Sequence, residues 1–107
     1  MAKERVTILG GGLSGLVTAL NLTAPENRGR YDVTVYQHGW RLGGKCATGR
    51  DFSKGARIQE HGLHVFMGQY DNAFNMVQEL YKEAAHPPFA TWEEAFTQQP
   101  SVALMEH

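Results

Sequence analysis

The 107-residue sequence has little cysteine, no surplus charge of either sign and no long hydrophobic run. Its one cysteine, Cys46, excludes an intrachain disulfide and is typical of a reducing compartment. Ten basic and eleven acidic residues nearly cancel, so a basic surface for nucleic acid is not expected. No apolar stretch approaches the roughly 20 residues of a membrane span. The run at 6–9 is too short for the core of a signal peptide. We therefore expect a cytoplasmic protein with no nucleic-acid partner and no membrane span.

The composition that is present is that of an ordinary globular protein. Apolar residues make up 42% and charged residues 20% of the chain, which argues against wholesale disorder. A chain of this length can bury at most one small core. We therefore predict a single domain over residues 1–107.

The first 36 residues follow a strand–helix–strand pattern. Residues 6–9 are a short apolar run, typical of a strand that is buried on both faces of a parallel sheet. After three glycines, leucines and a valine recur at helical spacing over residues 13–24, and Pro25 disfavours helical geometry in the residue before it. Residues 31–36 alternate as a second strand. This order predicts an α/β fold that begins with a Rossmann-like βαβ dinucleotide-binding unit.

The rest of the chain is less regular. Several glycines between residues 39 and 55 predict loops, and residues 57–60 are consistent with a short extended piece. An apolar stripe predicts a helix over residues 70–83, and a shorter helix is expected within 91–96. Residues 102–105 are predicted to form an apolar strand.

The glycine-rich turn after the first strand matches the pattern G-x-G-x-x-G. Gly10 permits a tight turn, Gly12 lets the backbone approach a pyrophosphate, and Gly15 lets the helix pack closely against the strand. Leu13 and Ser14 complete the motif where the helix begins, and the N–H groups there attract phosphate. The alternative interpretation is a glycine-rich turn that binds no ligand. Its place between a predicted strand and a predicted helix favours the binding function.

Gln37 stands where this type of fold usually has an acidic residue that accepts hydrogen bonds from the ribose hydroxyls. Its amide oxygen can accept one such bond but carries no charge. The ribose contact is therefore expected to be weaker, by about 1 kcal/mol. The loss of the acid also removes a group that repels a 2′-phosphate, so this position does not choose between cofactors.

A second glycine motif, Arg41-x-Gly43-Gly44-Lys45, follows the second strand. Together with the first motif it resembles the flavin-containing amine oxidase and phytoene desaturase superfamily of FAD-dependent oxidoreductases. The resemblance implies that FAD is the cofactor and that Arg41, Gly43, Gly44 and Lys45 contact its pyrophosphate. NAD-only Rossmann domains usually lack this second motif, which counts against the alternative of an NAD-binding dehydrogenase fragment.

Residues 57–66 resemble a segment of carotenoid and squalene-type desaturases that runs near the flavin, so the resemblance extends over about residues 5–84. It implies that Glu60, Gly62 and His64 lie near the cofactor, without a chemical role for any of them. The same segment does not read as a metal site, because the order Glu-His-x-x-His lacks the usual ligand set. Cys46 is interpreted as a small packed residue rather than a reactive thiol.

The resemblance covers only part of what such enzymes contain. Members of the superfamily are several times longer, insert a substrate domain, and return to the FAD domain late in the chain. We therefore expect an incomplete FAD-binding domain without its substrate domain, from a fragment, from a split enzyme completed by a second chain, or as a standalone module. A carbon–carbon desaturation of an apolar polyene is favoured over amine oxidation, and no catalytic residue is assigned.

The alternative from another class is a non-catalytic nucleotide-binding subunit. Such a subunit would dock on a partner chain, and the apolar residues 102–105 are the expected contact.

Overall fold

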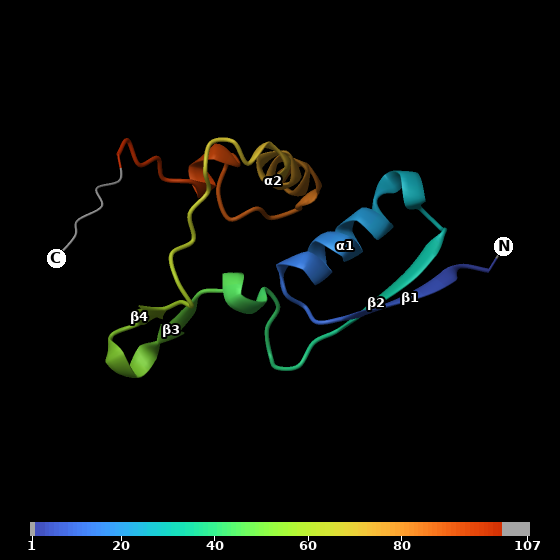
Figure 1. Cartoon of the computed structure of the whole chain (residues 1–107), viewed down its shortest axis with the longest axis horizontal. Coiled ribbons are helices and arrows are strands. Elements are labelled where there is room, and N and C mark those ends of the chain that lie inside the picture. The colour runs from blue at the N-terminus through green and yellow to red at the C-terminus, as the bar shows by residue number, and fades with distance from the viewer. Residues whose placement is uncertain (1, 102–107) are drawn as a thin grey trace. The chain divides into compact units, whose positions relative to one another are not determined.

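Two strands and the helix between them form the first part of the chain in the computed structural model (Figure 1). β1 (Glu4–Leu9) and β2 (Tyr31–Tyr36) pair in parallel, and α1 (Leu13–Thr23) connects them and contacts both. The helix ends before Pro25, because Ala24 has the extended backbone that a following proline favours. The predicted Rossmann-like βαβ unit is confirmed.

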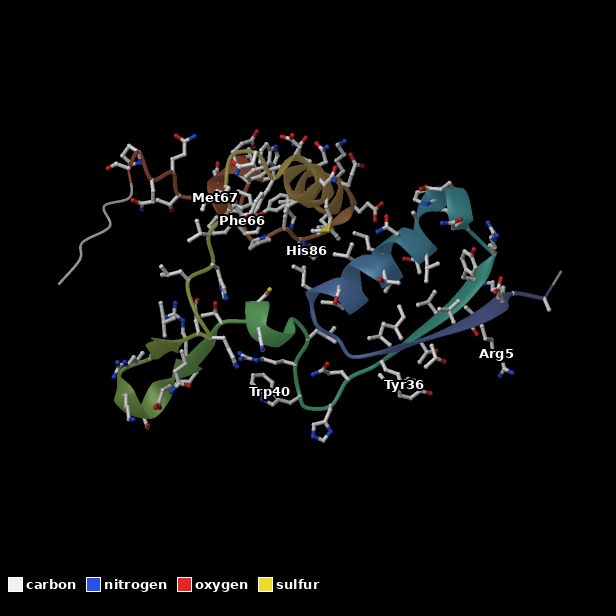
Figure 2. The ribbon with its side chains drawn as sticks, viewed as in Figure 1. Arg5, Tyr36, Trp40, Phe66, Met67 and His86 are labelled. Atoms are coloured by element: carbon white, nitrogen blue, oxygen red, sulfur yellow. The ribbon has the colours of Figure 1, made fainter. Side chains whose placement is uncertain are left out.

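The two faces of this sheet differ in burial. Half-buried side chains alternate along both strands on one face, and these are Val6, Ile8, Tyr31, Val33 and Val35. Figure 2 shows Arg5 and Tyr36 on the other side, pointing away from α1. On that side Leu9 is 83% exposed and Tyr36 is 60% exposed. The expectation that residues 6–9 are buried on both faces is therefore wrong for this structure, because a single helix covers only one face of the two-stranded sheet.

A second small sheet follows the second glycine motif. β3 (Gly49–Asp51) and β4 (Arg57–Gln59) pair antiparallel, and a 3-10 turn over Phe52–Lys54 joins them. The Asp51 carboxylate caps this turn by accepting a hydrogen bond of 3.0 Å from the Ser53 backbone N–H. β4 agrees with the extended piece expected at 57–60.

The remaining described residues centre on α2 (Asp71–Glu83), which confirms the helix predicted over 70–83. An aromatic cluster packs beside it, with Phe66 and Phe74 placed 5.0 Å and 5.3 Å from Phe96 between ring centroids, in edge or near-edge geometry. The short helix expected within 91–96 is one 3-10 turn, Glu93–Ala95.

The structure describes residues 2–101, so the strand predicted at 102–105 lies outside the described residues. Contacts divide the chain into two compact units, Met1–His64 and Val65–His107. Within the described part no apolar side chain is fully buried. Nor does any helix there combine the length and the apolar composition that crossing a membrane requires. The single domain over residues 1–107 stays a prediction.

Candidate functional site

The turn between β1 and α1 leads into a helix start with unpaired backbone donors. Gly10 has a φ of +105°, a left-handed conformation that favours glycine, and its N–H donates to the Tyr36 carbonyl at 2.8 Å. Gly12 is the N-cap residue of α1, and no side chain caps this end of the helix. The first N–H groups of α1 therefore have no partner within the helix, and the helix dipole adds positive charge there. Such a helix start is suited to a phosphate group.

Gly12 and Gly15 lie in opposite environments within this turn. A Cβ atom at Gly15 would overlap the carbonyl oxygen of Gly10 and lie 3.3 Å from Cγ2 of Ile8. The close helix-to-strand packing expected at Gly15 is therefore present. A Cβ atom at Gly12 would meet no atom within 4 Å. The backbone at Gly12 thus faces open space, as the close approach of a pyrophosphate would require.

The second glycine motif lies directly against the first. The Gly43 N–H donates to the Gly11 carbonyl at 2.8 Å, and Gly12 and Gly43 form an isolated parallel bridge. A Cβ atom at Gly44 would lie only 3.1 Å from the Gly12 Cα. Gly43 and Gly44 have φ values of +106° and +56°. Two motifs separated by a helix and a strand therefore form one surface, a contact that neither motif predicts by itself.

Gln37 is tied to this surface. Its Oε1 accepts a hydrogen bond of 2.8 Å from the Gly11 N–H, and its Nε2 donates to the His38 carbonyl at 2.8 Å. Gly11 is buried, and a Cβ atom there would overlap Leu42 and approach Gln37 Oε1 to 2.8 Å. Sequence reasoning missed Gly11 because the motif leaves its position unspecified. The run of three consecutive glycines was the only sign that its position matters.

The structure directs Arg41 toward the start of β3. Its Nη1 donates to the Thr48 carbonyl at 2.8 Å, and its guanidinium carbon lies 5.3 Å from the ring centroid of Trp40. Trp40, labelled in Figure 2, is 89% exposed. Lys45 is also exposed. An open hollow of about 790 Å³ lies beside Arg41 and is lined by Trp40, Arg41, Thr48, Gly49, Arg50, Phe52 and Gln59.

His64 contacts the second glycine motif, whereas Gly62 does not. The His64 Nε2 lies 3.2 Å from the Lys45 carbonyl oxygen. Its Nδ1 lies 3.8 Å from Oε1 of Glu60, which also accepts a hydrogen bond of 2.6 Å from the Thr48 hydroxyl. Gly62 is exposed, and a Cβ atom there would meet nothing within 4 Å.

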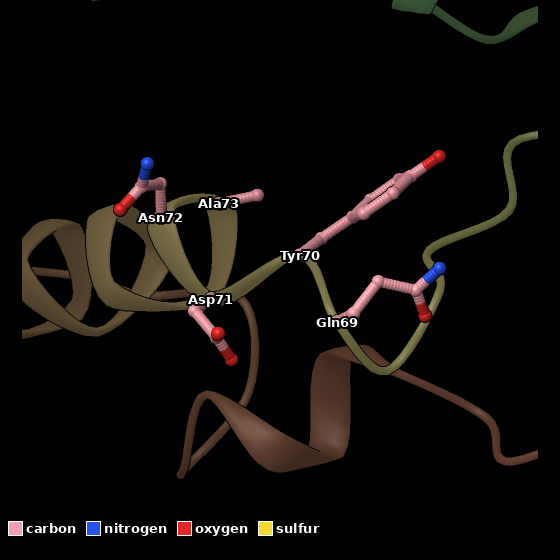
Figure 3. A pocket seen from close by; sticks show the side chains of 5 residues that line it. All are labelled: Gln69, Tyr70, Asp71, Asn72 and Ala73. Carbon is pink, nitrogen blue, oxygen red and sulfur yellow. The ribbon is translucent and has the colours of Figure 1, made fainter.

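A separate shallow hollow of about 410 Å³ lies at the start of α2 (Figure 3). Five consecutive residues line it, Gln69 to Ala73, and the Tyr70 ring extends away from the helix. It contains none of the site residues predicted from the sequence. Across residues 2–101 no group of three or more His, Cys, Asp or Glu side chains is placed to hold a metal ion.

The stretch that carries both glycine motifs matches known proteins. Residues 8–80 match the family described as NAD(P)-binding Rossmann-like domain. The zeta-carotene desaturase of Capsicum annuum is 37% identical over 81 residues, which is 76% of this chain and 13% of that protein. That of Synechocystis sp. is 38% identical over 76 residues, covering 71% of this chain and 14% of that protein. The carotenoid phi-ring synthase of Chlorobaculum tepidum is 34% identical over 74 residues, which is 68% of this chain and 11% of that protein.

These relatives confirm the resemblance to the desaturase superfamily, and the chain spans 11% to 14% of their length. No solved structure shows a significant match. The family match covers most of the chain and includes β2, α1, both glycine motifs and most of α2. Its ligand is accordingly a dinucleotide-type cofactor. The chain belongs to the NAD(P)-binding Rossmann-like domain family.

Proposed function

We propose that this chain binds FAD through its ADP-pyrophosphate half and is the nucleotide-binding part of a flavin-dependent desaturase. One observation carries the proposal: the two glycine turns lie against each other at the uncapped N-terminus of α1. Carotenoid desaturases share this stretch of sequence with the chain at 37–38% identity. An NAD-only Rossmann domain needs only the first turn, so the second turn supports a flavin dinucleotide.

The residues present fit such a ligand. In the proposed complex the phosphates accept hydrogen bonds from the first N–H groups of α1, at Leu13, Ser14 and Gly15, while Gly12 leaves room for them. Two cations at the second motif, Arg41 and Lys45, supply positive charge for the pyrophosphate.

The remaining predicted contacts have different geometry. Gly43 and Gly44 are proposed to bring backbone close to the pyrophosphate, as Gly12 does. Gln37 has one acceptor lone pair beyond its bond to Gly11 and is proposed to accept a ribose hydroxyl with it. Gly62 and His64 are proposed to lie near the cofactor without contacting the phosphates.

When bound, FAD would supply the hydride-accepting chemistry, and the protein would position it. The relatives named zeta-carotene desaturase support a polyene as substrate class. The chain spans only 13% to 14% of those relatives, so we propose that the substrate-binding part is supplied by further polypeptide, with a partner chain as one source. The cytoplasmic location stays a prediction.

A titration of the purified chain with FAD tests the proposal. We expect a change in flavin fluorescence on binding, a flavin absorbance that survives removal of free ligand, and competition by ADP, because ADP contains the half that the glycine turns bind. Tighter binding of NAD⁺ than of FAD would favour the dehydrogenase-fragment alternative. Failure of a folded chain to bind FAD, ADP or NAD⁺ would contradict a nucleotide site.

We expect Gln37→Glu to tighten FAD binding about fivefold, since a carboxylate accepts stronger hydrogen bonds from the ribose than an amide does. One carboxylate oxygen can still accept from the Gly11 N–H, as Oε1 of Gln37 does. Fluorescence titration measures the change. Gln37→Leu is the matched control: it keeps the approximate volume, removes the acceptor and should weaken binding. Equal affinity of the Glu and Leu variants would show that position 37 does not contact the ribose.

A further inference from the structure

Residues 60–64 are connected to the second glycine motif by a short polar network. The Thr48 hydroxyl donates to Oε1 of Glu60 at 2.6 Å, a distance typical of a charge-assisted bond to a carboxylate. The His64 ring lies between the same oxygen, 3.8 Å from its Nδ1, and the Lys45 carbonyl, which is within hydrogen-bond distance at 3.2 Å from its Nε2. Thr48, Glu60 and His64 lie at the surface, where the side chains of His64 and Glu60 are 32% and 28% exposed.

The polar network contacts the 3-10 turn that begins at Gly44. The Cys46 and Ala47 N–H groups bond to the carbonyls of Gly43 and Gly44, at 3.1 Å and 3.2 Å, and form the 3-10 turn of Gly44–Cys46. The Lys45 carbonyl, in the middle of this turn, faces His64. The network therefore acts on the backbone of the turn as well as on its side chains.

The same segment is fixed on its other side by the first glycine turn, through the hydrogen bond from Gly43 to Gly11. Glycines at positive φ are readily accommodated but lose more conformational freedom on ordering than other residues. A turn that contains two such glycines is therefore expected to need outside contacts to hold one conformation. The polar network is one of these contacts and involves residues outside both glycine motifs.

We propose that Thr48, Glu60 and His64 are positioning residues that hold the Gly43–Lys45 turn against the first glycine turn. They thereby set the separation of the two turns before ligand binds. The consequence for affinity rests on the proposed function: a preformed gap lowers the ordering cost when the pyrophosphate of a dinucleotide enters it.

Glu60 could either position the turn or contact the phosphates directly. Removing its charge changes the affinity in opposite directions under these two roles. A carboxylate that faced the phosphates would repel them, so its removal would tighten binding. A carboxylate that positions the turn has the opposite effect, because its removal lets the turn move. The direction of the affinity change therefore distinguishes the two roles.

The test compares Thr48→Val, which has nearly the same shape but no hydroxyl, with Thr48→Ser, which keeps the hydroxyl. Amide hydrogen exchange of the ligand-free chain, followed by NMR, is the first measurement. We expect the Cys46 and Ala47 amides to exchange about fivefold faster in Thr48→Val and within about twofold of wild type in Thr48→Ser. Unchanged exchange in Thr48→Val would overturn the proposal.

ADP affinity is the second measurement. Thr48→Val and Glu60→Gln are expected to bind ADP about fivefold more weakly, and Thr48→Ser nearly as well as wild type. Tighter ADP binding by Glu60→Gln would overturn the positioning role. If wild type binds no ADP, the proposed function fails, and the exchange measurement alone decides whether the network orders the turn.

A general loss of structure must be separated from the local effect. If Thr48→Val also accelerates exchange in β1 and β2, Glu60→Gln replaces it, since glutamine nearly preserves the side-chain shape and removes the charge that strengthens the bond from the Thr48 hydroxyl. Faster exchange confined to residues 43–48 in that variant supports the proposal. Unchanged exchange there overturns it.

Discussion

Gly15→Ala is expected to destabilise the βαβ unit by about 1–3 kcal/mol, a large share of the roughly 5–15 kcal/mol that holds a typical small domain folded. The new Cβ would overlap the Gly10 carbonyl oxygen and press on Ile8, whose Cγ2 would lie 3.3 Å away. Alanine has a higher helix propensity than glycine by about 1 kcal/mol, so the clash must exceed that gain. We expect it to do so because the overlapping atom belongs to the backbone and cannot rotate away.

A thermal melt followed by circular dichroism measures this effect. Gly68→Ala is the matched control, since a Cβ there meets nothing within 4 Å, and its melting temperature should stay near that of wild type. Alanine does occur at the third glycine position of such motifs, which requires a helix further from the strand. A Gly15→Ala protein that melts at or above the wild-type temperature would mean that α1 can shift in this way at little cost.

Gly12→Ala, three residues earlier in the same motif, is expected to fold normally and to lose dinucleotide binding. Gly12 has an extended backbone, with φ −76° and ψ 180°, which alanine adopts without strain, and its Cβ would enter open space. That space is where the pyrophosphate is proposed to lie against the backbone. We therefore expect FAD and ADP to bind at least about tenfold more weakly, or about 1.4 kcal/mol.

The measurement for Gly12→Ala is a fluorescence titration with FAD, paired with a thermal melt of the same preparation. Wild-type stability with weakened binding is the expected pair of results. Unchanged affinity would place the pyrophosphate elsewhere on the chain. Weakened binding together with a lowered melting temperature would assign Gly12 a structural role. We expect such a role at Gly15 but not at Gly12.

The elements of the βαβ unit could be predicted because each rests on local preferences. Alternation over residues 31–36, helical spacing over 13–24 and the proline at 25 act within a few residues of one another. The same holds for the helix over 70–83. The exposed face of the sheet, at Leu9 and Tyr36, could not be predicted from these patterns. Burial depends on which other elements cover a strand, and an apolar run is the same whether or not its second face is covered.

Some features of the candidate site could likewise be predicted from the sequence, and others could not. The two glycine motifs were visible in the sequence, because turns with positive φ require glycine at particular positions. The importance of Gly11 and the hydrogen bond from its N–H to Gln37 were not visible. Nor was the direction of Arg41, whose guanidinium bonds to the Thr48 carbonyl. The direction of the Arg41 side chain and the packing around Gly11 depend on neighbours that are distant in sequence.

The sequence by itself determined the βαβ unit, the turn at Gly10 and the family to which the chain belongs, since all three depend on residue type and short spacing. Only the tertiary structure decided that Gly43 bonds to Gly11 and that Glu60 and His64 lie beside Lys45 and Thr48. Such contacts join segments far apart along the chain. They arise from parallel pairing of β1 with β2 and from the β3–β4 hairpin, which bring those segments together.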